Sequence, residues 1–195
     1  FPPEGGQHNQ WYQCDQCQLA LETIDATHHR CPKCRQVFSG YPYDNVIYSR
    51  THSRLTRDLS VCAWAYALTG DEKYARRARE ILAGYAERYA KYPYHSANMG
   101  KLTDPPSKSG GHVFEQTLNE ASWMGQVCEA YDLARKAKVF SASDHRAVRE
   151  DFLVKVYENI AKHKAGNGNW QTYHNAAFMM IGGVLNRVDL VRQAI

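Results

Sequence analysis

Four of the six cysteines stand in two closely spaced pairs near the start of this 195-residue chain. The pairs are Cys14 with Cys17 and Cys31 with Cys34, each pair holds two residues between its members, and thirteen residues separate the pairs. A C-x2-C turn directs two thiolates at one tetrahedral metal ion, and a second turn supplies the other two. Because four protein ligands leave no open coordination position, the pattern predicts a structural zinc ion rather than a catalytic one.

Other readings of the cysteines stay open. In a secreted protein the same four residues would form two disulfides, and His28 or His29, beside the second pair, would be able to replace one thiolate as a ligand. Cys62 and Cys128 lie among apolar residues at helical spacing, which predicts buried free thiols.

A second chemical centre is predicted near the end of the chain. His174 follows a glycine-containing break and directly precedes the apolar stretch of a predicted central helix, so we expect it to face a cleft from the first turn. An imidazole there donates to a carboxylate or transfers protons, and the neighbouring Asn175 offers an amide donor; the alternative is a structural histidine. A catalytic role for both residues, with a substrate cleft lined by Trp170, Gln171 and Tyr173, is what the family resemblance of the surrounding block, given below, implies.

A third group recurs at spacings of three, four and seven residues, which predicts one polar and aromatic helix face. A substrate groove explains such a face, and a solvated face with the indole turned aside is the alternative. The predicted substrate-binding residues of this face are Gln116, Asn119, Glu120 and Trp123. Four further basic residues are each an ordinary surface charge or part of a subsite for an acidic polymer, namely Arg50, His52, Arg54 and Arg57.

Helices must position most of these side chains. Residues 1–48 read as irregular and β-like, with strand fragments at 37–38 and 46–48. From about residue 50 the apolar residues recur with a period of 3.6, and a TGD turn at 69–71 joins the first two helices as an antiparallel hairpin. Residues 92–111 form a long loop. The predicted helices cover about 52–69, 71–91, 112–138, 141–164 and 170–185, and another begins near Val188.

The predicted fold class is mainly α, with antiparallel helix hairpins that form part of an incomplete α/α toroid behind a zinc-ribbon-like N-terminal segment. Helix and loop lengths vary too much for a strict 34-residue repeat. Two parts are expected, a zinc-knuckle, irregular β-like segment over residues 1–48 and the first toroid helices over residues 49–195. Five helices and a severed sixth make about half a toroid of the kind that the family resemblance given below implies, so we expect a truncated chain and a missing C-terminal part of the same protein.

Composition narrows the possible functions. With 44% hydrophobic and 23% charged residues the chain has the composition of a folded protein. The net charge of +4 is spread among acidic residues, and few basic residues surround the knuckles, so no nucleic-acid partner is expected. No apolar run approaches the roughly 20 residues of a bilayer span. The first residues lack the basic and apolar regions of a signal peptide.

Several blocks, in this order, resemble the heparinase II/III-like and alginate-lyase-like polysaccharide lyases. After the first cysteine pair come GYPYDNVIYSRTH, AYALTGDEKYARRAREILAGYAERYAKY, GGHVFEQTLNEASWMGQVCEAYDL and GNWQTYHNAAFMMIG. The resemblance covers nearly the whole chain, and the NWQ-x-x-HNA block is its most specific piece. It implies the first part of an incomplete α/α toroid, followed in such enzymes by antiparallel β-sheet domains.

The resemblance also implies a reaction, the β-elimination of a uronic-acid polysaccharide such as alginate or a glycosaminoglycan. Hydrogen-bond donors neutralise the charge that develops on the uronate carboxylate when the C5 proton leaves, a base takes that proton, and an acid protonates the departing 4-oxygen. No organic cofactor is implied. In such enzymes a tyrosine moves the proton, and its place lies beyond residue 195, so the isolated piece is expected to be inactive.

The sequence departs from the family pattern around the predicted histidine. Related enzymes have an asparagine just before it or an acid shortly after it, whereas this chain has Tyr173 before His174 and Ala177 three residues after it. The competing function is a non-catalytic helical-repeat module that binds a glycan or a protein. A periplasmic or secreted location is expected, with the cytoplasm as the alternative.

Overall fold

The computed structural model describes residues 1–97, 109–163 and 168–194, and these are mainly helical, which confirms the predicted class. None of the described helices combines the length and apolarity that a bilayer span requires. The helices in chain order are α1 (Tyr43–Thr69), α2 (Glu72–Arg88), α3 (Thr117–Ala134), α4 (Ala142–Arg146), α5 (Val154–Lys162), α6 (Asn169–Leu185) and α7 (Val188–Arg192), with short 3-10 helices η1 (Asn9–Trp11) and η2 (Tyr89–Lys91) and a π-helical stretch η3 (Ala147–Leu153).

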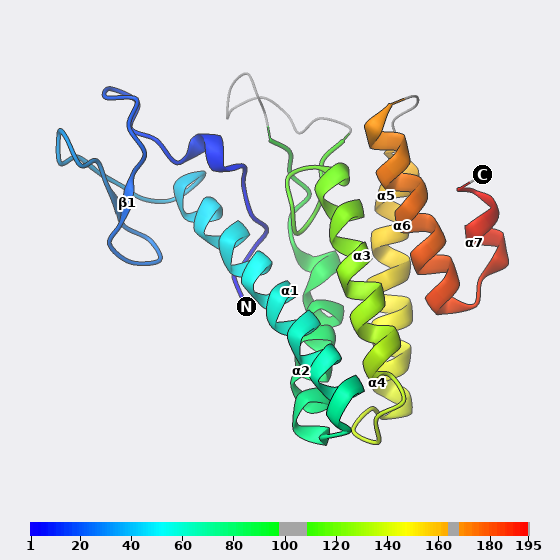
Figure 1. Ribbon diagram of the computed structural model, residues 1–195. Coiled ribbons are helices and arrows are strands. Elements are labelled where there is room, and N and C mark those ends of the chain that lie inside the picture. Colours follow the sequence, from blue (N-terminus) through cyan, green and yellow to red (C-terminus); the bar gives the residue numbers. More distant parts are fainter. Residues whose placement is uncertain (98–108, 164–167, 195) are drawn as a thin grey trace.

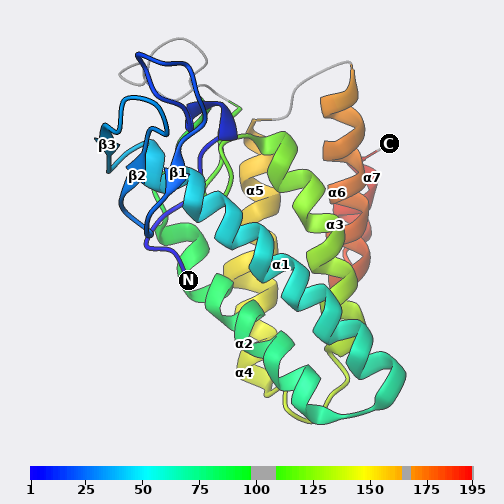
Figure 2. The same ribbon diagram turned by 60° about the vertical axis from the view of Figure 1, so that its left-hand side comes forward.

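The longer helices form two layers. Helices α1, α3 and α6 lie side by side with their N-terminal ends toward the same end of the molecule, and α2, η3 and α5 pack behind them (Figures 1 and 2). The predicted hairpin of α1 and α2 is present, because Gly70 ends α1 with a left-handed φ of 70° and the Asp71 side chain accepts the Lys73 amide at the start of α2.

One apolar core lies between the layers. Tyr85 of α2, Trp123 of α3 and Phe152 of η3 pack ring against ring, with centroids 4.9 to 5.5 Å apart. All three are almost fully buried. Aromatic contacts of this kind fix the two layers to each other and leave the N-terminal ends of α1, α3 and α6 free to carry polar groups.

The N-terminal segment has a small core of its own. Strands β1 (Glu22–Thr23), β2 (His29–Arg30) and β3 (Val37–Phe38) form an antiparallel sheet in the order β1-β2-β3, in which Thr23 pairs with His29 and Arg30 with Val37. The predicted strand at 37–38 is confirmed. The residues that close this core are Tyr12, Cys14, Leu21, Cys31, Phe38 and Val46.

Several predicted boundaries are wrong. The fragment at 46–48 is helical, because α1 begins at Tyr43 and buries Val46 against the N-terminal core, so tertiary packing overrides the β preference of these residues. Helix α3 begins at Thr117 instead of near residue 112, since the amides of His112 and Val113 are bound by a side chain. Most of the predicted loop, residues 98–108, lies outside the described residues.

Candidate active site and metal centre

The four paired cysteines come together beside the small sheet. Their sulfur atoms all lie within 4.8 Å of one another, and the Sγ atoms of Cys14 and Cys34 are 3.7 Å apart. Four Zn–S bonds of about 2.3 Å place the sulfurs roughly 3.8 Å from each other, whereas a disulfide bond measures about 2.05 Å. All six cysteines of the chain are free thiols. The predicted clustering of the four cysteines is therefore confirmed, and the distances between their sulfur atoms suit four ligands of one metal ion.

The two knuckles share one backbone geometry. The residue after the second cysteine, Gln18 or Arg35, adopts a left-handed φ of 54° or 66°. Its amide donates to the carbonyl of the first cysteine, over 2.8 Å to Cys14 and 3.1 Å to Cys31. Burial opposes ionisation of Cys31, but hydrogen bonds from the backbone amides of Lys33 and Cys34 and from the neighbouring Cys34 and Cys14 thiols together lower the pKa of that thiol to about 6. The thiolate is the form that binds metal.

His29 joins the cysteine segment to the helices and is not part of the sulfur cluster. The ring is fully buried, with Nε2 2.9 Å from Asp44 Oδ1 in the first turn of α1 and Nδ1 2.8 Å from the Tyr12 hydroxyl. His28 is exposed and pairs with Asp25. Within the described residues, the potential metal ligands that cluster are the four cysteines.

His174 lies in the first turns of α6, as predicted, but its imidazole is completely buried. Its Nε2 is 3.1 Å from Thr117 Oγ1 at the start of α3, and the Trp170 ring meets it edge-on at 6.2 Å. The contact therefore joins the first turns of two neighbouring helices. In the structure as described, the ring has no exposed surface from which to meet a ligand.

The neighbours of His174 point in different directions. Asn175 is half-buried, and its Oδ1 is buried with no hydrogen-bond partner among the described residues. Trp170 and Gln171 are half-buried, whereas Tyr173 is 46% exposed. These side chains lie at the end of the molecule where the chain enters α6, and none of them lines the groove between α1 and α3.

The four residues predicted to share a face of α3 point to different places. Gln116 precedes the first turn, Asn119 and Trp123 line a groove against α1, and Glu120 points into the interior. The Glu120 carboxylate accepts the amides of His112 and Val113, both at 2.8 Å.

Two side chains from other elements also donate to the Glu120 carboxylate. The Tyr89 hydroxyl donates over 2.7 Å and the Asn159 amide over 2.9 Å. A side chain at Gly111 would come within 2.7 Å of the same carboxylate, so glycine is required there by close approach. Glu120 thus holds the loop before α3 in place, and it has no free oxygen facing the groove.

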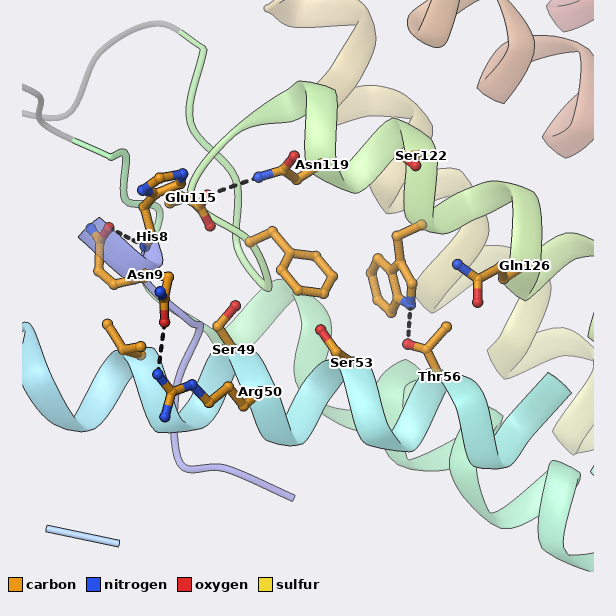
Figure 3. A pocket seen from close by; sticks show the side chains of 14 residues that line it. His8, Asn9, Ser49, Arg50, Ser53, Thr56, Glu115, Asn119, Ser122 and Gln126 are labelled. Atoms are coloured by element: carbon orange, nitrogen blue, oxygen red, sulfur yellow. Dashed lines mark hydrogen bonds between the residues drawn. The ribbon is translucent and has the colours of Figure 1, made fainter. Parts of the chain in front are cut away.

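The groove runs between the N-terminal halves of α1 and α3 and encloses about 360 Å³. Figure 3 shows side chains of both helices directed into it, with η1 and the residue before it at one end. Such a volume falls in the range of pockets that bind small organic ligands, roughly 300 to 1,000 Å³. Its lining consists of Gln7, His8, Asn9, Val46, Ser49, Arg50, Ser53, Thr56, Phe114, Glu115, Asn119, Ser122, Trp123 and Gln126.

Both charge signs are present in the groove. Arg50 is exposed, donates to Asn9 Oδ1 over 2.7 Å, and lies 4.4 Å from the centre of the Tyr12 ring. Glu115 is almost fully buried and accepts the Asn119 amide over 2.8 Å. Burial raises the pKa of the Glu115 carboxyl, so its neutral form is favoured relative to an exposed glutamate.

A second pocket of about 390 Å³ lies between η2 and α5. It contains two histidines, His112 and His163, and burial lowers the pKa of His163.

Neither this pocket nor the groove residues His8, Asn9 and Glu115 were predicted from the sequence. For the groove, the available signal was the row of small hydroxyl residues at helical spacing, Ser49 and Ser53 with Thr56.

Comparisons with known proteins agree with the resemblance. The chain is 31% identical over 159 residues to an alginate lyase of Stenotrophomonas maltophilia, a match that covers 75% of this chain and 19% of that protein. It is 29% identical over 165 residues to an exo-oligoalginate lyase of Saccharophagus degradans, covering 82% of this chain and 20% of that enzyme.

The chain thus spans about a fifth of the length of these relatives. The sequence model of the alginate lyase family matches residues 3–195, which takes in the cysteine knuckles, the groove and the helix of His174. The chain therefore belongs to the alginate lyase family.

Proposed function

We propose that the protein is a polysaccharide lyase that cleaves a uronic-acid polymer, alginate before glycosaminoglycans, by β-elimination. The observation that carries this proposal is the family match over residues 3–195, together with relatives named as alginate lyases. In this proposal the chain contributes the cysteine segment and the first helices of an incomplete α/α toroid to a longer enzyme.

The placement of polar groups supports such a reaction. Helices α1, α3 and α6 direct their N-terminal ends toward one end of the molecule (Figure 1). The groove is lined by residues of the N-terminal halves of α1 and α3, and His174 lies in the first turns of α6. The positive ends of helix dipoles favour an acidic polymer. When the C5 proton leaves, charge develops on the uronate carboxylate, and donors placed there lower the barrier.

Within this proposal His174 and Asn175 remain the candidates for neutralising that charge. For His174 to donate to the carboxylate, its contact with Thr117 has to be exchanged for one with the substrate. We expect His174→Gln in the full-length enzyme to lower kcat at least about 100-fold with an unchanged unfolding midpoint. A comparable loss in Thr117→Val together with a lowered midpoint in both variants would instead assign His174 to holding α3 against α6.

The reaction itself has a direct test. The full-length protein is incubated with alginate, heparin, heparan sulfate and hyaluronan, and the ultraviolet absorbance of the unsaturated product is followed. We expect a signal with alginate. Folded protein that gives no signal with any uronate polymer would refute the lyase proposal and leave the non-catalytic glycan- or protein-binding module as the better explanation.

We also propose that Cys14, Cys17, Cys31 and Cys34 hold one structural zinc ion. The sulfur distances support this ligand set. The ion would secure a segment that has only a small apolar core, and it takes no part in the elimination. Since the polymer substrate occurs outside the cell, we propose a periplasmic or secreted location, which cell fractionation tests.

A further inference from the structure

The groove between α1 and α3 exists because small hydroxyl side chains stand where the two helices face each other. Ser49 and Ser53 of α1 lie opposite Ser122 of α3 (Figure 3), whereas farther along α1 the core positions are Leu59 and Ala63. Among the described residues, no hydrogen bond engages the hydroxyls of these three serines. The groove therefore presents unused hydrogen-bonding groups to whatever occupies it.

At one end of the groove, the Arg50 guanidinium is held in place by two contacts. The Arg50 guanidinium is held over the Tyr12 ring and by Asn9, and no carboxylate pairs with it in the part of the chain that the structure describes. Two contacts that restrict its rotamers leave further N–H groups free to donate. A planar guanidinium held in this way matches the two oxygens of a carboxylate.

The floor and the far wall of the groove have different chemistry. Phe114 and Trp123 form an aromatic floor, with ring centroids 5.6 Å apart and the indole nitrogen bound to Thr56. Glu115 and Asn119 stand beside them as an acceptor and a donor already joined by a hydrogen bond. An apolar floor below convergent hydroxyl, amide and carboxyl groups suits a pyranose ring, whose C–H face is apolar and whose rim carries hydroxyls.

The groove also lies next to the proposed reaction centre. Thr117, the partner of His174, and Asn119, which lines the groove, are two residues apart in the first turn of α3. Helix α6 packs on one side of α3 and α1 on the other. A polymer that crosses the N-terminal end of α3 would therefore meet the His174 side and the groove in succession.

We propose that the groove is a subsite for one uronate residue of the polymer, with its carboxylate bound by Arg50, its hydroxyls by the serines and Asn119, and its ring on Phe114 and Trp123. This inference rests on the proposed function, since it takes the polymer to be a uronate.

The test uses the full-length protein and four variants. Arg50→Gln removes the proposed carboxylate ligand, and Ser53→Leu or Ser122→Leu fills the groove without a change in charge. Arg76→Gln is the charge-matched control, because Arg76 is exposed on α2 and does not line the groove. Circular dichroism and the unfolding midpoint show which variants are folded, and an exposed arginine is the change least expected to disturb folding.

Two measurements are made on each variant, namely kcat and KM on alginate and the Kd of methyl mannuronide by NMR titration, with methyl mannoside as the neutral probe. The methyl glycosides have no 4-linked sugar to lose and are not cleaved. For Arg50→Gln we expect KM and the mannuronide Kd to rise roughly tenfold or more, with kcat nearly unchanged. The leucine variants should raise the Kd of both methyl glycosides, and Arg76→Gln should change neither Kd.

The outcomes separate the subsite from the function. Suppose that the wild type cleaves alginate, and that the Arg50→Gln and leucine variants have the same KM and Kd as the wild type. The subsite is then refuted, and the lyase proposal stands. If folded wild type cleaves no uronate polymer, the lyase proposal fails. In that case mannuronide binding that is lost in Arg50→Gln keeps the groove as a uronate site, and absence of binding refutes the groove as well.

Discussion

At the scale of single residues, the Glu120 carboxylate binds three separate segments of the chain to one another. It is fully buried and accepts five hydrogen bonds, three from the loop before α3, one from Tyr89 of η2 and one from Asn159 of α5. Glu120→Ala would leave these donors unsatisfied, so we expect the free energy of unfolding to fall by about 3 to 5 kcal/mol. Urea unfolding followed by circular dichroism measures the change.

The matched control for Glu120 is Glu129→Ala. Glu129 is exposed on the same helix, and its loss should change the free energy of unfolding by no more than about 0.5 kcal/mol. Equal unfolding midpoints for the two variants would show that the Glu120 network does not stabilise the fold.

His52 makes the stability depend on pH. Burial lowers the pKa of this imidazole from its ordinary 6.5 to about 4, against the smaller opposing effect of the Glu4 carbonyl. Because the folded pKa lies below the unfolded one, the stabilisation is complete above pH 6.5 and is lost as the pH falls toward 4. Between pH 7 and pH 5 the loss attributable to His52 is on the order of 2 kcal/mol.

The check on His52 compares two pH dependences. In His52→Gln, which does not titrate, the difference in unfolding free energy between pH 7 and pH 5 should be smaller than in the wild type by about that amount. An identical difference in both proteins would mean that His52 does not set the acid sensitivity.

At the scale of the elements, the cysteine segment depends on its metal. We expect one zinc ion per chain by atomic absorption, lost in Cys31→Ser together with protease resistance of residues 1–42, while the helices remain folded. Cys62→Ser is the control, since Cys62 lies in α1 outside the sulfur cluster and should keep the zinc. A wild-type protein without metal and without free thiols after denaturation would indicate disulfides instead.

The start of α4 shows a second element-scale effect. The Ser141 hydroxyl accepts the Asp144 amide, and the Asp144 carboxylate accepts the Ser141 amide, which makes a capping box. Ser141→Ala should lower the free energy of unfolding by about 1 kcal/mol, and Ser141→Thr, which keeps the capping oxygen, by clearly less. Thermal unfolding ranks the two, and equal losses would contradict the capping role.

At the scale of the whole molecule, the chain is a small part of the length of its relatives. We propose that proton transfer needs groups outside these residues, so the 195-residue chain alone should give no unsaturated product from alginate while the full-length enzyme does. Circular dichroism first establishes that the short chain is helical. Measurable lyase activity in the short chain would overturn this expectation.

Exposed apolar groups on α1 agree with that expectation. Val61, Trp64 and Leu68 recur at helical spacing and are exposed. A stripe of this kind is typical of a surface that packs against further protein. In the proposed toroid, later helices would cover it.

Local patterns predicted the parts of the molecule that depend on neighbours in the chain. The spacing of the cysteines predicted their cluster, the TGD turn predicted the hairpin, and the residues around His174 predicted the start of a helix. The strand prediction at 46–48 was wrong because Val46 packs in a core whose other members lie 8 to 34 residues before it. Local preference is weak compared with such burial.

The sequence by itself determined the helical class, the cysteine cluster and the family, because these follow from periodicity, spacing and matched blocks. Only the tertiary structure decided where each polar side chain of α3 and α6 points. Glu120 and Asn119 are neighbours in the chain, yet the Glu120 side chain points into the interior and the Asn119 side chain lines the groove. The reason is that α1 and α5 approach different sides of α3. Such directions are set by packing between distant segments, which no local pattern encodes.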